Sequence, residues 1–398
     1  MKTIPTILIA CLMAACLPGA ALAQTEKPPV LNARELAPAE LLAGPGITVD
    51  HVVPTDGFYG IFTVRGEYGS VQARGLAMLR IRVAETQALA RLEEVSRREA
   101  VVGGARESAQ QTIHAAGQTL RDPAGTVERL PESVGGLFSR LGGKIEKRVE
   151  SATGSGENSA PVEREGFANA RRKLAEQLGV DPYTDNPLLT HKLDEVARWQ
   201  RMGAIALGVA SSGAGAWAGI ATKTANLVWS QPPKEVRAAN EKRLAALVPN
   251  TGAGEIRNFL DNPAFTPTTQ TLFVDKLESL PVPKGRNNLL RLAGEMETRD
   301  QVRFLIAATG LLADYHRRVA LLTSVESRDR LPVGFTSKGS LILPVPVDCL
   351  AWTDGLMKFR DRVDLRAARR EMLISGNATN RARKELSARG WKLNEKFH

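Results

Sequence analysis

The fold of the C-terminal part is decided by the stretch Val333-Gly334-Phe335-Thr336-Ser337-Lys338-Gly339-Ser340-Leu341-Ile342-Leu343. Two apolar runs flank a short polar turn that contains glycine, and this pattern predicts a β-hairpin. Further along, Asp348 is placed to cap a helix that runs to about Arg362, because a short acidic side chain can accept hydrogen bonds from the first free N–H groups of a helix.

The remaining C-terminal residues predict a strand, a helix and a last strand. The strand covers Glu371–Ile374, the helix covers Thr379–Ala388 and ends at Arg389-Gly390, and Trp391–Leu393 forms the last strand. Together with the hairpin they predict a small basic α+β module over residues 331–398. The module either folds by itself or extends a sheet formed earlier in the chain.

Positive charge is concentrated in this module. The whole chain has a formal net charge of +10, and residues 358–398 hold twelve Lys and Arg against five Asp and Glu. The predicted helix presents the candidate binding residues Arg381, Arg383, Lys384 and Arg389. Its apolar stripe is modest, which favours docking on a sheet over insertion in lipid. We expect either a solvated basic face or contact with an anionic envelope component or an acidic protein partner, and a peripheral membrane contact stays open.

The N-terminal part predicts a small antiparallel β-meander followed by a helix, over residues 24–100. Phe58–Val64 is strand-like and is followed by a turn at Gly66–Gly69. A third run, Leu79–Val83, alternates apolar residues with arginines and is predicted as a strand, and the helical period begins at Ala84.

The middle of the chain predicts helices. Residues 101–165 form an irregular, glycine-interrupted segment with a linker near 151–163, and residues 166–330 form a large helical domain. Asn186-Pro187 and Asn262-Pro263 are predicted as two independent helix starts, because asparagine caps and proline fits the first helical position. The fold class is therefore α+β.

The stretch from Met202 to Thr222 is uncharged and rich in Gly, Ala and Ser. Its small residues Ser211, Gly215 and Gly219 share one helix face, which allows close helix packing or association within a membrane. A glycine-rich nucleotide loop is disfavoured, because the glycine spacing misses the dinucleotide fingerprint by one residue.

The first 23 residues have the features of a signal peptide. Lys2 precedes an apolar run over Ile4–Leu17, and small residues stand at the −3 and −1 positions of a cleavage site after Ala23. These features predict an exported, periplasmic protein. Acylation at Cys16 is the alternative, and it predicts a lipid-anchored envelope protein.

Catalytic residues are hard to identify in the sequence. Cys349 beside a helix start would be a nucleophile, with His316 as its partner, whereas a buried cysteine is the commoner arrangement. The five histidines are far apart, so no metal or cofactor is expected, and nucleic acid is not expected in an exported compartment. The leading hypothesis is a non-enzymatic envelope protein. An exported hydrolase acting on cell wall or lipid, and a membrane-active protein using residues 202–222, are the alternatives.

Overall fold

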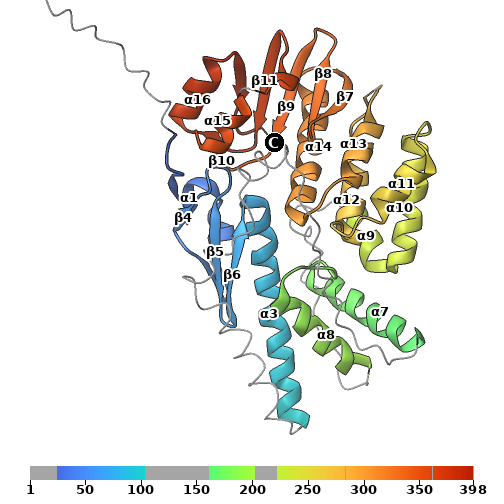
Figure 1. Ribbon diagram of the computed structural model, residues 1–398. Coiled ribbons are helices and arrows are strands. Elements are labelled where there is room, and N and C mark those ends of the chain that lie inside the picture. Colours follow the sequence, from blue (N-terminus) through green and yellow to red (C-terminus); the bar gives the residue numbers. More distant parts are fainter. Residues whose placement is uncertain (1–24, 104–160, 202–221, 283, 361, 398) are drawn as a thin grey trace, which may run out of the picture.

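The computed structural model describes residues 25–103, 161–201, 222–282, 284–360 and 362–397. The fold class is α+β, with small antiparallel sheets near the N-terminus, a helical middle and a C-terminal sheet with helices (Figure 1). The predicted signal peptide, including Cys16, lies outside the described residues, and so do Ser211, Gly215 and Gly219. Of the predicted irregular segment 101–165, only the two ends are described, and both are helical.

The N-terminal sheet has four antiparallel strands in the order β2-β3-β5-β6. Their bounds are Ala43–Gly44, Ile47–Val49, Ile61–Gly66 and Gly69–Arg74. The neighbouring elements are β1 (Val30–Asn32), which pairs with β4 (Val52–Pro54), and the short helices α1 (Ala33–Leu36) and α2 (Ala39–Leu42). Along β5, buried Phe62 and Val64 alternate with more exposed residues, as the period-two pattern predicts.

The predicted third strand at Leu79–Val83 is wrong. These residues belong to the long helix α3 (Leu76–Gly103), and the strand that follows the Gly66–Gly69 turn is β6. Leu79 and Val83 are four residues apart, so one face of a helix buries them together. The strand prediction places the side chain of Arg82 on the face of the sheet that is open to solvent, but Arg82 is only 8% exposed.

The helix α3 connects two hydrophobic cores. Its first turns pack Met78 and Val83 against the N-terminal sheet. Further along, Ala88 and Leu92 pack against α7 (Pro161–Leu178) and α8 (Pro187–Arg201), which lie beside α3 in Figure 1. The sheet and the first helices of the middle region are therefore held by one continuous element.

The described part of the middle region holds six further helices. They are α9 (Thr222–Ser230), α10 (Pro233–Leu247), α11 (Ala253–Leu260), α12 (Pro267–Glu278), α13 (Arg286–Gly294) and α14 (Arg299–Arg318). The last five share a large core, in which the rings of Phe259 and Phe273 are 5.3 Å apart.

Only one of the two Asn-Pro sequences begins a helix. The side-chain oxygen of Asn186 accepts from the N–H of Leu188, and Pro187 opens α8, as predicted. At Asn262 the prediction is wrong, because the next helix, α12, begins at Pro267 with Thr266 as its cap. The amide of Asn262 instead donates to carbonyl oxygens at the end of α13, so this asparagine joins two helices.

The C-terminal sheet has five strands in the order β13-β11-β9-β8-β7. Their bounds in chain order are β7 (Leu322–Arg328), β8 (Leu331–Thr336), β9 (Ser340–Val345), β11 (Arg369–Ile374) and β13 (Trp391–Asn394). The hairpin and the two later strands are confirmed. β7 begins within the range predicted as helical, and the module forms its own sheet rather than extending the N-terminal one.

Helices cover both faces of this sheet. Ile342 and Leu373 share a core with Tyr315 of α14. Leu341 and Met372 share another core with α15 (Asp354–Arg360), the 3₁₀ turn η2 (Val363–Leu365) and α16 (Asn380–Ser387). Every residue of β9, which is parallel to β11 and antiparallel to β8, is buried, as expected of a central strand covered on both faces.

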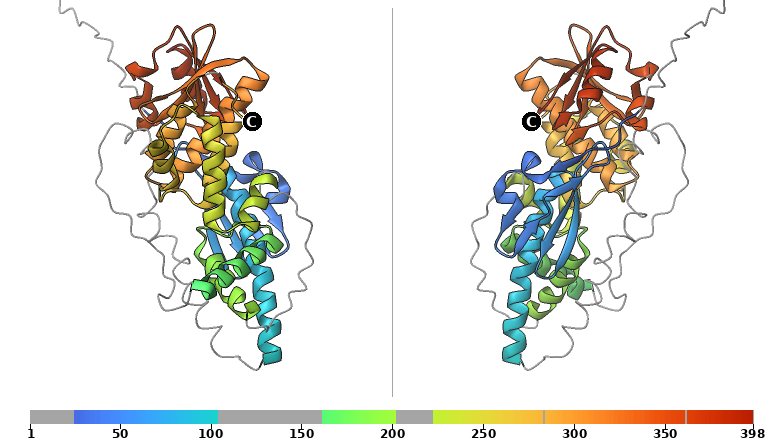
Figure 2. Two further views of the ribbon diagram at one scale, coloured as in Figure 1. Left: turned by 90° about the vertical axis from the view of Figure 1, so that its right-hand side faces the viewer. Right: turned by 90° about the vertical axis from the view of Figure 1, so that its left-hand side faces the viewer.

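The N-terminal part packs directly on the C-terminal module (Figure 2). The carbonyl oxygen of Phe58 accepts from the N–H groups of Asp348 and Cys349 at 2.9 and 3.0 Å. Cys349 lies in the short strand β10 (Cys349–Leu350), which pairs with β12 (Asn377–Ala378). The predicted helix start at Asp348 is therefore wrong, because the helix begins at Asp354.

Candidate functional site

The predicted basic helix is present as α16. The hydroxyl of Thr379 accepts from the N–H of Ala382 at 3.1 Å and caps the helix. Ala382 and Leu386, four residues apart, are fully buried against the sheet. The helix is thus amphipathic and docks on the C-terminal sheet, which leaves its other face to solvent.

Two of the four predicted binding residues have partners within the fold. Arg383 forms an ion pair with Glu395 at 2.8 Å. Arg389 forms one with Glu385 at 2.6 Å, and its guanidinium stacks 5.2 Å from the centre of the Trp352 ring. Because each of these two arginines is paired with a carboxylate of the same module, its charge is largely compensated and is less available to an external anionic partner.

Arg381 and Lys384 differ from them. Lys384 is exposed and Arg381 is half-buried, and neither makes an ion pair with another described residue. They are three residues apart on α16, so their side chains leave the helix on one side. Of the predicted set, these two are the residues that remain available to an anionic partner.

The acidic residues between 358 and 398 explain why Arg381 and Lys384 have no ion-pair partner among the described residues of this segment. Four described carboxylates occur between residues 358 and 398, and each is held by an arginine or a lysine of the same segment. The pairs are Asp364–Arg362, Glu371–Lys392, Glu385–Arg389 and Glu395–Arg383. No further described carboxylate of this segment remains to neutralise the other basic side chains.

Several cations without an ion-pair partner lie near the end of the C-terminal sheet at which β9 and β11 begin. Arg369 opens β11 and pairs in register with Ser340, which follows the turn that carries Lys338. The C-terminal end of α16 reaches this end too, because Arg370 donates to the carbonyl oxygen of Arg389. We give the name basic surface to five exposed or half-exposed cations without a described ion pair. Lys338, Arg366 and Arg369 lie near this end of the sheet, whereas Arg381 and Lys384 lie on α16, whose N-terminal end is beside Leu350 at the other end.

The two candidate catalytic residues lie at different ends of the C-terminal sheet. His316 lies in the last turn of α14, and its Nδ1 accepts from the N–H of Leu322, which is beside the β8–β9 turn. Cys349 follows the opposite end of β9, whose six residues span about 20 Å. The structure does not bring them together.

The environment of Cys349 also disfavours a reactive thiol. It is 5% exposed, and burial raises the pKa of its thiol to about 11, with the nearby carboxylates of Glu26 and Asp348 acting in the same direction. A thiolate nucleophile needs the reverse, a lowered pKa in an electropositive setting.

Sequence reasoning missed a partly buried charge network where three parts of the chain meet. We name it the junction network. It contains Arg74 at the end of β6, Arg82 and Glu85 on α3, Asp185 before α8, and Asp300 and Arg303 on α14. The one signal in the sequence was the pair Arg82 and Glu85, which are three residues apart and face each other only if the segment is helical.

Arg82 and Asp185 form the centre of the junction network. Arg82 contacts Glu85 and Asp185, each at 2.6 Å, and Asp185 also pairs with Arg303. Burial opposes ionisation of Asp185, but the guanidiniums of Arg303 and Arg82 outweigh it and hold the pKa of this carboxyl well below its usual range. Asp185 is therefore ionised at neutral pH, and its ion pairs join α3 and α14 to the segment just before α8.

Two other buried carboxylates also tie distant segments together. Asp348 accepts from the N–H groups of Gly60 and Leu76 at 3.0 and 3.1 Å and so caps α3 from the C-terminal module. Asp181 accepts from the Thr268 hydroxyl at 2.7 Å. Burial raises the pKa of Asp348 to about 6 and that of Asp181 to about 7.

Such pKa values suit general acid–base chemistry, but these side chains already serve as acceptors for donors within the fold.

Within the described ranges, no three His, Cys, Asp or Glu side chains are grouped to hold a metal ion. No helix in the described part of the chain has the length and apolar character that a bilayer crossing requires.

Comparison of the chain with family models, curated proteins and solved structures finds no match.

Proposed function

We propose that the protein is an exported, non-enzymatic binding protein of the cell envelope, and that its basic surface contacts an anionic envelope component. The observation that supports this proposal is the distribution of partners in the C-terminal module. The four described acidic residues between 358 and 398 are all paired internally, whereas Arg381, Lys384 and Arg369 have no described ion-pair partner. Uncompensated cations on one surface attract polyanions and anionic lipid headgroups.

The placement of Glu26 is consistent with the proposed export. Its N–H donates to the carbonyl oxygen of Trp352 at 2.9 Å, and its carboxylate accepts from the N–H of Trp352 and the hydroxyl of Thr379. Cleavage after Ala23 would therefore keep this docked residue. If Cys16 were acylated instead, the nine residues up to Glu26 would hold α16 within about 30 Å of the membrane surface.

The experiment measures sedimentation of residues 24–398 with isolated envelopes over a range of NaCl concentrations. Each exposed cation near an anionic surface contributes about 1 kcal/mol. The double variant Arg381→Ala/Lys384→Ala should therefore bind about 25-fold more weakly. Binding of the unchanged chain should fall as salt rises.

A matched control removes the same charge elsewhere. Lys234 and Lys242 on α10 are both exposed, so Lys234→Ala/Lys242→Ala tests net charge alone. Equal binding by the two double variants would contradict a role for the basic surface. Recovery of the intact, uncleaved chain from the cytoplasm would contradict export.

A further inference from the structure

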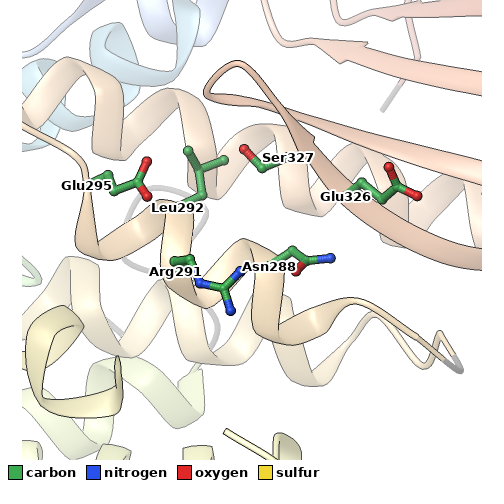
Figure 3. Close-up of a pocket in the computed structure, with 6 residues that line it drawn as sticks. All are labelled: Asn288, Arg291, Leu292, Glu295, Glu326 and Ser327. Atoms are coloured by element: carbon green, nitrogen blue, oxygen red, sulfur yellow. The ribbon is translucent and has the colours of Figure 1, made fainter. Parts of the chain in front are cut away.

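A groove of about 240 Å³ lies between α13 and the edge strand β7 (Figure 3). One wall is α13, with Asn288 and Arg291, together with Glu295 just after the helix, and the other wall is β7, with Glu326 and Ser327. Leu292, which is 1% exposed, lies between the two walls at the base. The groove lies on the opposite edge of the sheet from β13, away from α16.

The pairing of β7 with β8 determines which main-chain groups face this groove. The hairpin closes at Arg328 and Leu331, and hydrogen-bonded and non-hydrogen-bonded pairs alternate from there. Ser327 faces Pro332, which has no N–H, so this is a non-hydrogen-bonded pair. The N–H and C=O of Ser327 therefore point away from β8, toward the groove.

At the preceding outward-facing residue of β7, which is Val325, the main-chain N–H and C=O already have partners within the chain. The N–H of Val325 donates to the carbonyl oxygen of Lys284 at 3.0 Å, and the carbonyl oxygen of Val325 accepts from the side chain of Asn288 at 3.3 Å. At Gly285, with φ +94°, the chain turns away from the edge into α13. Two residues further along β7, the matching groups of Ser327 have no described partner.

One carboxylate that lines the groove has no ion pair with a described residue. Arg291 pairs with Glu255 at 3.1 Å, outside the groove, and Glu326 pairs with Arg328 at 2.6 Å. Glu295 is exposed and makes no ion pair with another described residue through its side chain. A partner that enters the groove would therefore meet an unpaired carboxylate.

We propose that this groove binds a short extended peptide segment, which adds to the edge of β7 at Ser327 and places a cationic side chain against Glu295. Main-chain hydrogen bonds to an edge strand supply affinity in this mode of recognition, and neighbouring side chains supply specificity. The segment continues the pairing that Lys284 begins. This proposal is independent of the basic surface.

The probe is a fluorescently labelled hexapeptide of alternating valine and lysine, and anisotropy is measured with residues 24–398. Ser327→Pro removes only the outward-facing N–H, because that group makes no bond to β8, and Pro is tolerated on edge strands. Binding should be lost in Ser327→Pro, retained in Ser327→Ala, and weakened at least 5-fold in Glu295→Lys. A peptide of alternating valine and glutamate should bind more weakly than the lysine peptide.

Three results would overturn the proposal. The first is no binding of the lysine peptide at about 1 mM, which would mean that the charged side chains only guard the edge. The second is binding that survives both Ser327→Pro and Glu295→Lys. The third is a concentration-dependent dimer that Ser327→Pro abolishes, which would assign the edge to a second copy of the chain. If Ser327→Pro fails to fold by its urea midpoint, Glu295→Lys, which changes an exposed side chain, gives the deciding measurement.

Discussion

Replacement of Asp348 by asparagine should make the stability of the protein less sensitive to pH. Asp348 holds the start of α3 to the C-terminal module through the N–H groups of Gly60 and Leu76. An asparagine oxygen can still accept from these groups but carries no charge. The variant therefore removes the cost of burying a carboxylate and keeps part of the contact.

The magnitude follows from the pKa of Asp348. Burial raises it from its ordinary 3.8 to about 6, so the folded state binds a proton more tightly than the unfolded state. Stability must then fall as the pH rises from about 4 to about 6 and stay lower above that range. A shift of about two pKa units corresponds to about 3 kcal/mol.

The assay is urea unfolding of residues 24–398 at pH 4 and pH 8, followed by the fluorescence of Trp352 and Trp391, which lie in the core of the C-terminal module. Between these pH values, the free energy of unfolding of Asp348→Asn should gain about 3 kcal/mol relative to the unchanged protein. Asp354→Asn, which removes an exposed carboxylate nearby, serves as the control. A difference between Asp348→Asn and the unchanged protein that is the same at both pH values would refute the reasoning.

Three further predictions concern other parts of the fold. Asp185→Asn leaves Arg82 and Arg303 without their shared carboxylate and should lower the free energy of unfolding by about 3 kcal/mol at pH 7. A loss under about 1 kcal/mol in urea unfolding would contradict a central role of Asp185 in the junction network. Cys349 should not react with a thiol reagent at pH 7 until the protein unfolds, because it is buried and its pKa is raised; rapid labelling of the native protein would revive the hydrolase alternative. Gly285→Ala should lower the free energy of unfolding by more than about 1 kcal/mol, because the new Cβ would lie 1.8 Å from the carbonyl oxygen of Val325. The control is Gly339→Ala, at a residue with a similar positive φ and open space around it. Equal shifts of the melting temperature in the two variants would show that the close approach does not matter.

The C-terminal module could be predicted in detail because its signals are local. A turn glycine, the capping side chain of Thr379 and an apolar run each act over a few residues, and the hairpin and α16 follow from them. The helix after Asp348 was misplaced because that carboxylate caps a different helix, α3, which lies 272 residues earlier in the chain. A capping residue identifies its helix only when cap and helix are neighbours in sequence.

The error at Leu79–Val83 has a different cause. Over five residues, periods of 2 and 3.6 can place the same apolar side chains on a buried face, and only the burial of Arg82 separates the two. A buried arginine needs partners, and these come from Asp185 and Glu85. Glu85 lies in the same stretch, but Asp185 is about a hundred residues away, so a short stretch of sequence contains only part of the evidence.

The basic surface was predictable as a surplus of charge but not as a set of residues. The sequence places Arg381, Arg383, Lys384 and Arg389 on one helix and does not show which of them are paired. Glu395 reaches Arg383 only because β13 returns beside α16. The fold therefore reduces four candidates to Arg381 and Lys384.

The buried carboxylates act in opposite directions on stability as the pH changes. Asp348 and Asp181 have raised pKa values, so their ionisation weakens the fold as the pH rises through about 6 and 7. Asp185 has a lowered pKa, so its contribution is complete above about pH 4 and is lost only as the pH falls toward its folded value. Between these ranges Asp185 is charged and paired while Asp348 and Asp181 are mostly neutral. These three groups therefore place the greatest stability close to the ordinary carboxyl pKa, at about pH 4, and removing Asp185 should flatten the acid side of that maximum while removing Asp348 flattens the other.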